Sequence, residues 1–251
     1  VLNLKLAHPD SRLTFLTKER FADIASRIPG VDKVCAVPES IGAKDLYRLA
    51  LELDTRNFDL IVDLHGNFRS WFVRTLVSAQ QKSSYPKRRL DRWLTVHRKQ
   101  FPSESHHTID LYNAALTPWG VTTPSRRPVL TTPSIAPIRT EHCRENRVVI
   151  APGAAHENKK WLLERFRDVA RTLHQRHQVK ITWATTKSDA GNAQSENWPA
   201  DSLTELVDAP VPAIADLMAR SRLTIANDSG LAHLSSAVGT PVIAAFGPTH
   251  P

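Results

Sequence analysis

The stretch from 223 to 251 carries the residues best suited to chemistry. A short, apolar, β-branched run at 223–226 predicts a buried strand, and the capping residues at 227–229 predict that a helix follows directly. A helix that starts at the carboxyl end of a strand presents unpaired N–H groups and the positive end of its dipole, so it favours an anion. The groups expected to meet a phosphate there are the amides of Ser229, Gly230 and Leu231, with the ring of His233 one helical turn further on.

Two neighbouring lysines, Lys159 and Lys160, follow a second predicted strand at 147–151. In a parallel sheet the carboxyl ends of the strands meet at one edge, so these lysines are expected on the same side as the helix start. A lysine there can meet a diphosphate as a compact point charge while the helix supplies amides from the other side. The second half of the chain therefore predicts a site for a diphosphate.

A further candidate site lies in the first half, after the apolar run Leu60–Leu64. Such a run is typical of a central parallel strand covered on both faces. We expect His65, Asn67 and Arg69, which follow it, to bind a ligand because ligands gather at strand ends in open α/β sheets. In a purely structural alternative, the glycine between them serves only the turn and Arg69 is only a solvated surface residue.

The densest basic segment, KSSYPKRRLDRWLTVHRK, spans 82–99 in a chain of net charge +8. Cations interleaved with aromatic residues could bind nucleic acid through phosphate contacts and base stacking. The same residues could instead contact anionic lipid, with Trp93 and Leu94 at the headgroup level. A solvated charged face is the third interpretation.

Strands and helices alternate along the whole chain; near its start, for example, a helix is expected at 19–28, a strand at 33–37 and a helix at 44–53. This alternation predicts parallel βαβ construction and the α/β class. We expect two Rossmann-like domains that face each other across a cleft, at 1–135 and 146–251. A proline-rich segment connects the two domains, and we expect the domain boundary to lie within it at 133–145.

Several other functions are disfavoured by what the sequence lacks. It has no apolar run of about 18 residues, no G-x-S-x-G elbow and no G-x-G-x-x-G turn, which argues against a membrane span, a serine hydrolase and dinucleotide oxidoreduction. Its two cysteines and dispersed histidines lack the spacing of a zinc site, so we expect no metal centre.

Three motifs together resemble glycosyltransferase family 9, the ADP-heptose:lipopolysaccharide heptosyltransferases. Residues 228–233 (DSGLAH) with 246–249 (FGPT) are similar to its D-(S/T)-G-x-x-H and FGPT signature. Residues 61–70 (IVDLHGNFRS) are similar to its DLQG-x-x-(R/K)-S segment, and 151–161 to its PGA…K-x-W segment. The resemblance implies the GT-B fold, in which two Rossmann-like domains bind acceptor and donor.

The resemblance also implies roles for individual residues. For the donor it implies binding by Lys159, Asp228, Ser229, Gly230, Leu231 and His233, with Asp189 as the carboxylate for the ribose hydroxyls. For the acceptor it implies binding by His65, Asn67, Arg69, Arg88 and Arg89. The implied partners are ADP-heptose or a related nucleotide sugar, the glycolipid of the lipopolysaccharide inner core and an anionic membrane surface, but no nucleic acid.

The implied reaction is inverting transfer of a heptose, with the nucleotide sugar as substrate and no cofactor required. In the family the base is an aspartate in a loop that precedes a segment similar to residues 1–16, and we expect this chain to lack that loop and the family's C-terminal end. The catalytic residue is therefore unknown, since Asp63 and His65 are only the nearest substitutes. We expect a cytoplasmic protein that works at the inner face of the inner membrane. The alternative is a non-catalytic module that binds nucleic acid or anionic membrane through 82–99.

Overall fold

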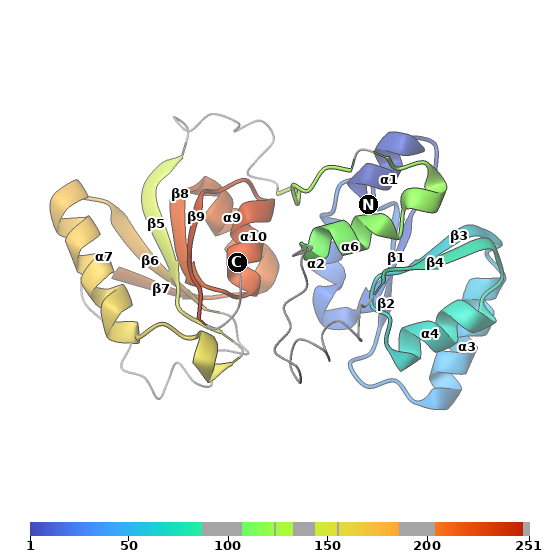
Figure 1. Cartoon of the computed structure of the whole chain (residues 1–251). Helices are drawn as coiled ribbons and strands as arrows, with labels where there is room; N and C mark the ends of the chain where they lie inside the picture. Colours follow the sequence, from blue (N-terminus) through green and yellow to red (C-terminus); the bar gives the residue numbers. More distant parts are fainter. Residues whose placement is uncertain (87–106, 123, 133–143, 155, 186–203, 248–251) are drawn as a thin grey trace, which may run out of the picture. The chain divides into compact units, whose positions relative to one another are not determined.

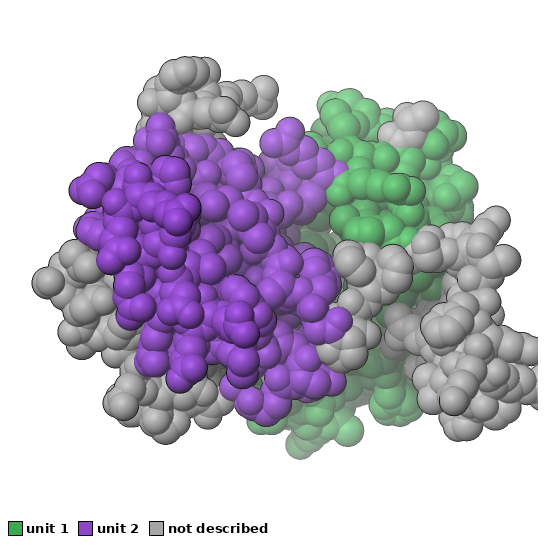
Figure 2. Space-filling model, turned by 60° about the vertical axis from the view of Figure 1, so that its left-hand side comes forward, with its two compact units in different colours: residues 1–22, 30–126 green, residues 23–29, 127–251 purple. Residues whose placement is uncertain are grey.

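The computed structural model describes residues 1–86, 107–122, 124–132, 144–154, 156–185 and 204–247 (Figure 1). The chain forms two compact units, coloured separately in Figure 2. The first unit contains residues 1–22 and 30–126, and the second contains 23–29 and 127–251. The boundary expected at 133–145 falls mostly outside the described residues.

The first unit is built from two parallel strand pairs and the helices that follow them. β1 pairs with β2 and β3 pairs with β4. Within the described residues β3 pairs with β4 alone. Both faces of β3 are covered, as expected, because Phe58 and Ile61 pack on one apolar cluster and Leu60 and Val62 on another. The elements are α1 (Leu2–Ala7), β1 (Thr14–Lys18), a 3-10 turn (Glu19–Phe21), β2 (Lys33–Val37), α3 (Ala43–Asp54), β3 (Phe58–Asp63), α4 (Phe68–Leu76), β4 (Ala79–Ser84), α6 (Thr108–Ala114) and a 3-10 turn (Thr117–Trp119).

Helices α3 and α4 pack together and provide the core next to β3. Leu46, Ala50 and Leu53 recur on one face of α3 at helical spacing, and they meet Val73 and Val77 from the end of α4. Burial of this face holds α4 against α3 beside β3.

The carboxylate of Asp54, at the end of α3, accepts a hydrogen bond of 2.6 Å from the Ser78 amide just before β4. This hydrogen bond lowers the pKa of Asp54. Folding lowers the pKa of this carboxyl group, so its ionised form stabilises the folded state at pH values above about 4, the pKa in the unfolded chain. This contribution to the free energy of unfolding disappears as the pH falls through the lower pKa of the folded state.

Asp54→Asn should therefore be less stable than the wild type at about pH 6, and the difference should shrink below about pH 3. Urea unfolding at the two pH values measures it. A difference of the same size at both would show that ionisation of Asp54 does not contribute.

The second unit contains a five-stranded parallel sheet in the order β7-β6-β5-β8-β9. Helix α7 covers one face, with Phe166 fully buried, while α9 and α10 cover the other (Figure 1). The elements are β5 (Glu145–Ala151), a 3-10 turn (Glu157–Lys159), α7 (Leu163–His177), β6 (Lys180–Thr185), β7 (Thr204–Asp208), α9 (Val211–Arg220), β8 (Ser221–Asn227), α10 (Gly230–Ala237) and β9 (Val242–Ala245).

A short segment from early in the chain, 23–29, belongs to the second unit. It includes most of α2 (Ala22–Ser26), and Ile24 and Ile28 pack against the apolar cluster under α9 and α10. Arg27 forms an ion pair of 2.9 Å with Asp216 on α9. The sequence predicts one helix over 19–28, whereas the structure divides it into a 3-10 turn and α2 at the point where the chain enters the second unit.

Candidate active site

The carboxyl edge of the five-stranded sheet brings together the loops that follow β5, β8 and β9. Lys159, in the turn after β5, forms an ion pair of 2.6 Å with Asp228, which follows β8. The two side chains are 26% and 14% exposed, so the ion pair is partly accessible to solvent. Lys160 instead contacts Glu157 at 2.6 Å. Of the two lysines, Lys159 is the one placed beside the start of α10.

Helix α10 begins at Gly230 without a side-chain cap from its N-cap residue, Ser229. The Ser229 hydroxyl is buried and has no hydrogen-bond partner among the described residues. In that same part of the chain no acceptor contacts the amides of Ser229, Gly230 and Leu231. An unpaired hydroxyl and three unpaired amides at a helix N-terminus are the groups that an anionic ligand would satisfy.

The expectation that residues 227–229 cap α10 is wrong, because two of the three side chains bind elsewhere. Asn227 contacts Pro152 and Trp161, and Asp228 contacts Lys159. His233 is exposed on α10, and its amide donates to the Ser229 carbonyl at 3.4 Å. These contacts leave the helix start itself open for a ligand.

Sequence reasoning missed two residues that shape this site. Asn227 is fully buried and forms hydrogen bonds with both ends of the single loop 152–161. Gly247 lies so close to the turn before Lys159 that an added Cβ would collide with the Asn158 carbonyl oxygen. The sequence includes Gly247 in the FGPT motif without giving it a role, and nothing in it identifies the partners of Asn227.

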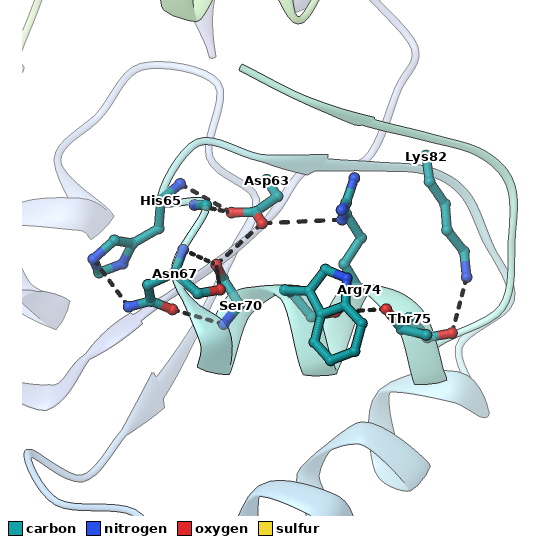
Figure 3. A network of polar contacts seen from close by, with 9 residues as sticks. Asp63, His65, Asn67, Ser70, Arg74, Thr75 and Lys82 are labelled. Atoms are coloured by element: carbon teal, nitrogen blue, oxygen red, sulfur yellow. Dashed lines mark hydrogen bonds and ion pairs between the residues drawn. The ribbon is translucent and has the colours of Figure 1, made fainter. Parts of the chain in front are cut away.

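In the first unit the loop between β3 and α4 is organised around the buried carboxylate of Asp63 (Figure 3). One oxygen accepts hydrogen bonds from the amides of His65 (2.9 Å) and Gly66 (2.7 Å). The other accepts from the Ser70 hydroxyl at 3.0 Å and lies 4.0 Å from the Arg74 side chain. Asp63 thus supports the loop. Both of its carboxylate oxygens are engaged by these donors, so it is not free to act as a general base.

Asn67 caps α4, since its side chain accepts from the Ser70 amide while the Ser70 hydroxyl accepts from the Asn67 amide. The side-chain nitrogen of Asn67, Nδ2, also lies 3.2 Å from Nε2 of the His65 ring. Asn67 is therefore engaged in the capping box, whereas Arg69 is exposed and no described residue pairs with it. Gly66 has a φ of 56°, so the turn does require a glycine here.

Some predicted site residues lie outside the described part of the chain, namely Asp189, Arg88 and Arg89. Of the basic segment 82–99, only 82–86 is described. Lys82 donates to the Thr75 carbonyl at the end of α4, and Tyr85 packs edge-on against Tyr112 on α6. The described start of the segment thus contributes to packing within the first unit.

Comparison with known families identifies the class of protein to which this chain belongs. The profile of glycosyltransferase family 9 (heptosyltransferase) matches residues 46–251. The chain belongs to glycosyltransferase family 9. It is a glycosyltransferase, and the two units built on parallel strands confirm the expected α/β class and GT-B type fold.

Curated and solved relatives of this family 9 chain extend over nearly all of it. It is 26% identical to lipopolysaccharide heptosyltransferase 3 of Escherichia coli, over 99% of this chain and 78% of that protein. It is 23% identical to lipopolysaccharide core heptosyltransferase OpsX of Haemophilus influenzae, over 98% and 73%. The structure of E. coli heptosyltransferase WaaC with ADP-2-deoxy-2-fluoro heptose matches with a TM-score of 0.73 at 20% identity, covering 100% of this chain and 84% of that one. A family 9 structure from Veillonella parvula matches with a TM-score of 0.78 at 20% identity, covering 100% and 76%.

None of the helices in the described ranges is long and apolar enough to cross a membrane. In the same ranges no cluster of three histidine, cysteine or acidic side chains forms a candidate metal site.

Proposed function

We propose that this family 9 glycosyltransferase moves a heptose from ADP-heptose to a hydroxyl of the lipopolysaccharide inner core, with inversion at the anomeric carbon. The observation that carries the proposal is the Lys159–Asp228 pair beside the uncapped start of α10. Departure of a nucleoside diphosphate develops negative charge, which an ammonium group and helix amides stabilise. The relatives that cover nearly the whole chain are named as lipopolysaccharide heptosyltransferases, which supports this choice of sugar and acceptor.

In this proposal the donor's diphosphate lies against the amides of Ser229, Gly230 and Leu231, with the Ser229 hydroxyl as a further donor. The ammonium of Lys159 turns from Asp228 towards the same phosphates, which places two kinds of positive group around them. The donor is itself the substrate, so no cofactor is needed.

On the acceptor side, the proposal assigns Arg69 to the phosphates or carboxylates of the glycolipid. Arg69 is exposed in the first turn of α4, directly after a loop whose hydrogen bonds are made by Asp63 and Asn67. We place the reaction at the cytoplasmic face of the inner membrane, where the net charge of +8 favours an anionic surface. Family membership favours this use of the basic residues over a module that binds nucleic acid.

The experiment that tests the proposed function combines donor binding with transfer. Calorimetry with ADP, UDP and GDP should show binding of ADP in preference to the other two. Incubation with ADP-heptose and a heptose-deficient lipopolysaccharide acceptor should add one heptose mass to the acceptor. Absence of ADP binding would refute the assigned donor. ADP binding without any transfer would refute the assigned acceptor or activity.

A further inference from the structure

Asn227, the last residue of β8, has a fully buried side chain whose two polar ends are both paired. Its Nδ2 donates to the Pro152 carbonyl at 2.6 Å, and its Oδ1 accepts from the Trp161 amide at 2.9 Å. A carbonyl can only accept and an amide N–H can only donate, so this position needs a donor at one end and an acceptor at the other. A primary amide of this length satisfies both. An aspartate would place a carboxylate oxygen against the Pro152 carbonyl.

The contact of Asn227 with Trp161 fixes the chain two residues beyond Lys159. The Trp161 ring packs edge-on against Phe166 with 4.8 Å between the ring centroids, and Phe166 is fully buried. The Trp161 backbone and ring are therefore both anchored. The ammonium of Lys159 is held by Asp228, the residue next to Asn227. Two consecutive residues at the end of β8 thus hold both ends of the segment 159–161.

Gly247, after β9, limits the same segment from another side. A Cβ at this position would collide with the Asn158 carbonyl oxygen and lie 3.6 Å from the Lys159 Cα. Because backbone atoms occupy this space, an added methyl group must displace the turn at 157–159. The position of Lys159 is therefore set by neighbours on β8 and after β9.

We propose that Asn227 is a positioning residue for the donor's diphosphate and acts through Lys159. It holds the turn at 157–159 so that the ammonium lies beside the uncapped start of α10, and it has no contact with the donor itself. The inference rests on the proposed function, because it presupposes a nucleoside diphosphate at this edge of the sheet. A displacement of about 1 Å in a positioned group is enough to weaken an interaction severely.

The test separates the diphosphate from the nucleoside. Calorimetry measures the affinity of the whole chain for ADP and for adenosine, which lacks both phosphates. Asn227→Ala and Gly247→Ala should each weaken ADP binding about tenfold, and adenosine binding should change less than about twofold. Gly247 is exposed, so its variant carries the test if Asn227→Ala fails to fold.

Ser235→Ala is the matched control. Its hydroxyl donates to Thr224 at 2.8 Å in the same layer of β8 and α10, and both residues are fully buried. This variant also loses a buried hydrogen bond, but it should keep the wild-type ratio of ADP to adenosine affinity. A second check is the double variant Asn227→Ala/Lys159→Ala, which should bind ADP as weakly as Lys159→Ala alone because the two residues act through one contact.

Three outcomes would overturn the inference. Equal losses of ADP and adenosine affinity in the Asn227 and Gly247 variants would show a structural role only. Additive losses in the double variant would show that Asn227 acts independently of Lys159. In both of these cases the wild type binds ADP and this inference alone fails. The third outcome, a wild type that does not bind ADP, overturns the proposed function as well.

Discussion

Replacing Lys159 with alanine should lower kcat/KM for heptose transfer about 10²- to 10³-fold, the range seen when one group that stabilises developing negative charge is removed. The variant loses the cation at the start of α10 and leaves Asp228, whose side chain is 14% exposed, without this ion pair. The affinity for ADP should fall at least about tenfold, because a hydrogen bond to a charged group contributes about 1.5–3 kcal/mol.

Lys160→Ala is the matched control for this prediction, since the two lysines are adjacent. The ammonium of Lys160 contacts Glu157 in place of Asp228. Kinetics with ADP-heptose and calorimetry with ADP, both at one fixed ionic strength, compare the two variants. Losses of the same size in both would mean that local positive charge matters rather than the position of Lys159. A retained rate in Lys159→Ala would remove the lysine from the mechanism.

The second large effect concerns the stability of the first unit. Asp63→Ala should lower its free energy of unfolding by about 2–4 kcal/mol, because the amides of His65 and Gly66 and the hydroxyl of Ser70 lose a shared acceptor. Urea unfolding followed by circular dichroism measures the change. The affinity for ADP, a property of the second unit in our proposal, should stay at the wild-type value.

Asp59→Ala is the control for Asp63, since it lies on the same strand. Its exposed carboxylate accepts a hydrogen bond of 2.8 Å from Gln80, and its loss should cost less than about 0.5 kcal/mol. If Asp63→Ala kept its stability but abolished transfer, the carboxylate would act in the chemistry instead of supporting the loop.

The spacing of apolar residues correctly predicted those helices and strands whose local sequence pattern agrees with the way they pack in the structure. The strand expected at 33–37 has those bounds in the structure, and the helix expected at 44–53 extends by one residue at each end. The helix expected at 19–28 is divided, because residues 23–29 pack on the second unit whereas residues 19–22 belong to the first. Such a change of partner depends on residues more than 180 positions away, such as Asp216, which no local pattern contains.

The candidate site was predictable in its location but not in its internal contacts. A helix start after a buried strand indicated the anion site, and the structure leaves that helix start open. Local sequence predicts that the side chains at 227–229 all act as helix caps, because asparagine, aspartate and serine are all favoured at that position. Their actual partners, Pro152 and Lys159, come from the loop after a neighbouring strand and are set by the sheet order.

The assignment of residues 23–29 to the second unit means that the chain passes between the two units three times, near 22, 29 and 126. The second unit is therefore not encoded by one contiguous stretch of the gene. A chimera that exchanges the second unit between relatives at one junction near 126 would combine the 23–29 segment of one parent with the α9 of the other. Only an exchange that transfers both pieces keeps Ile24, Arg27 and Ile28 with the surface on which they pack.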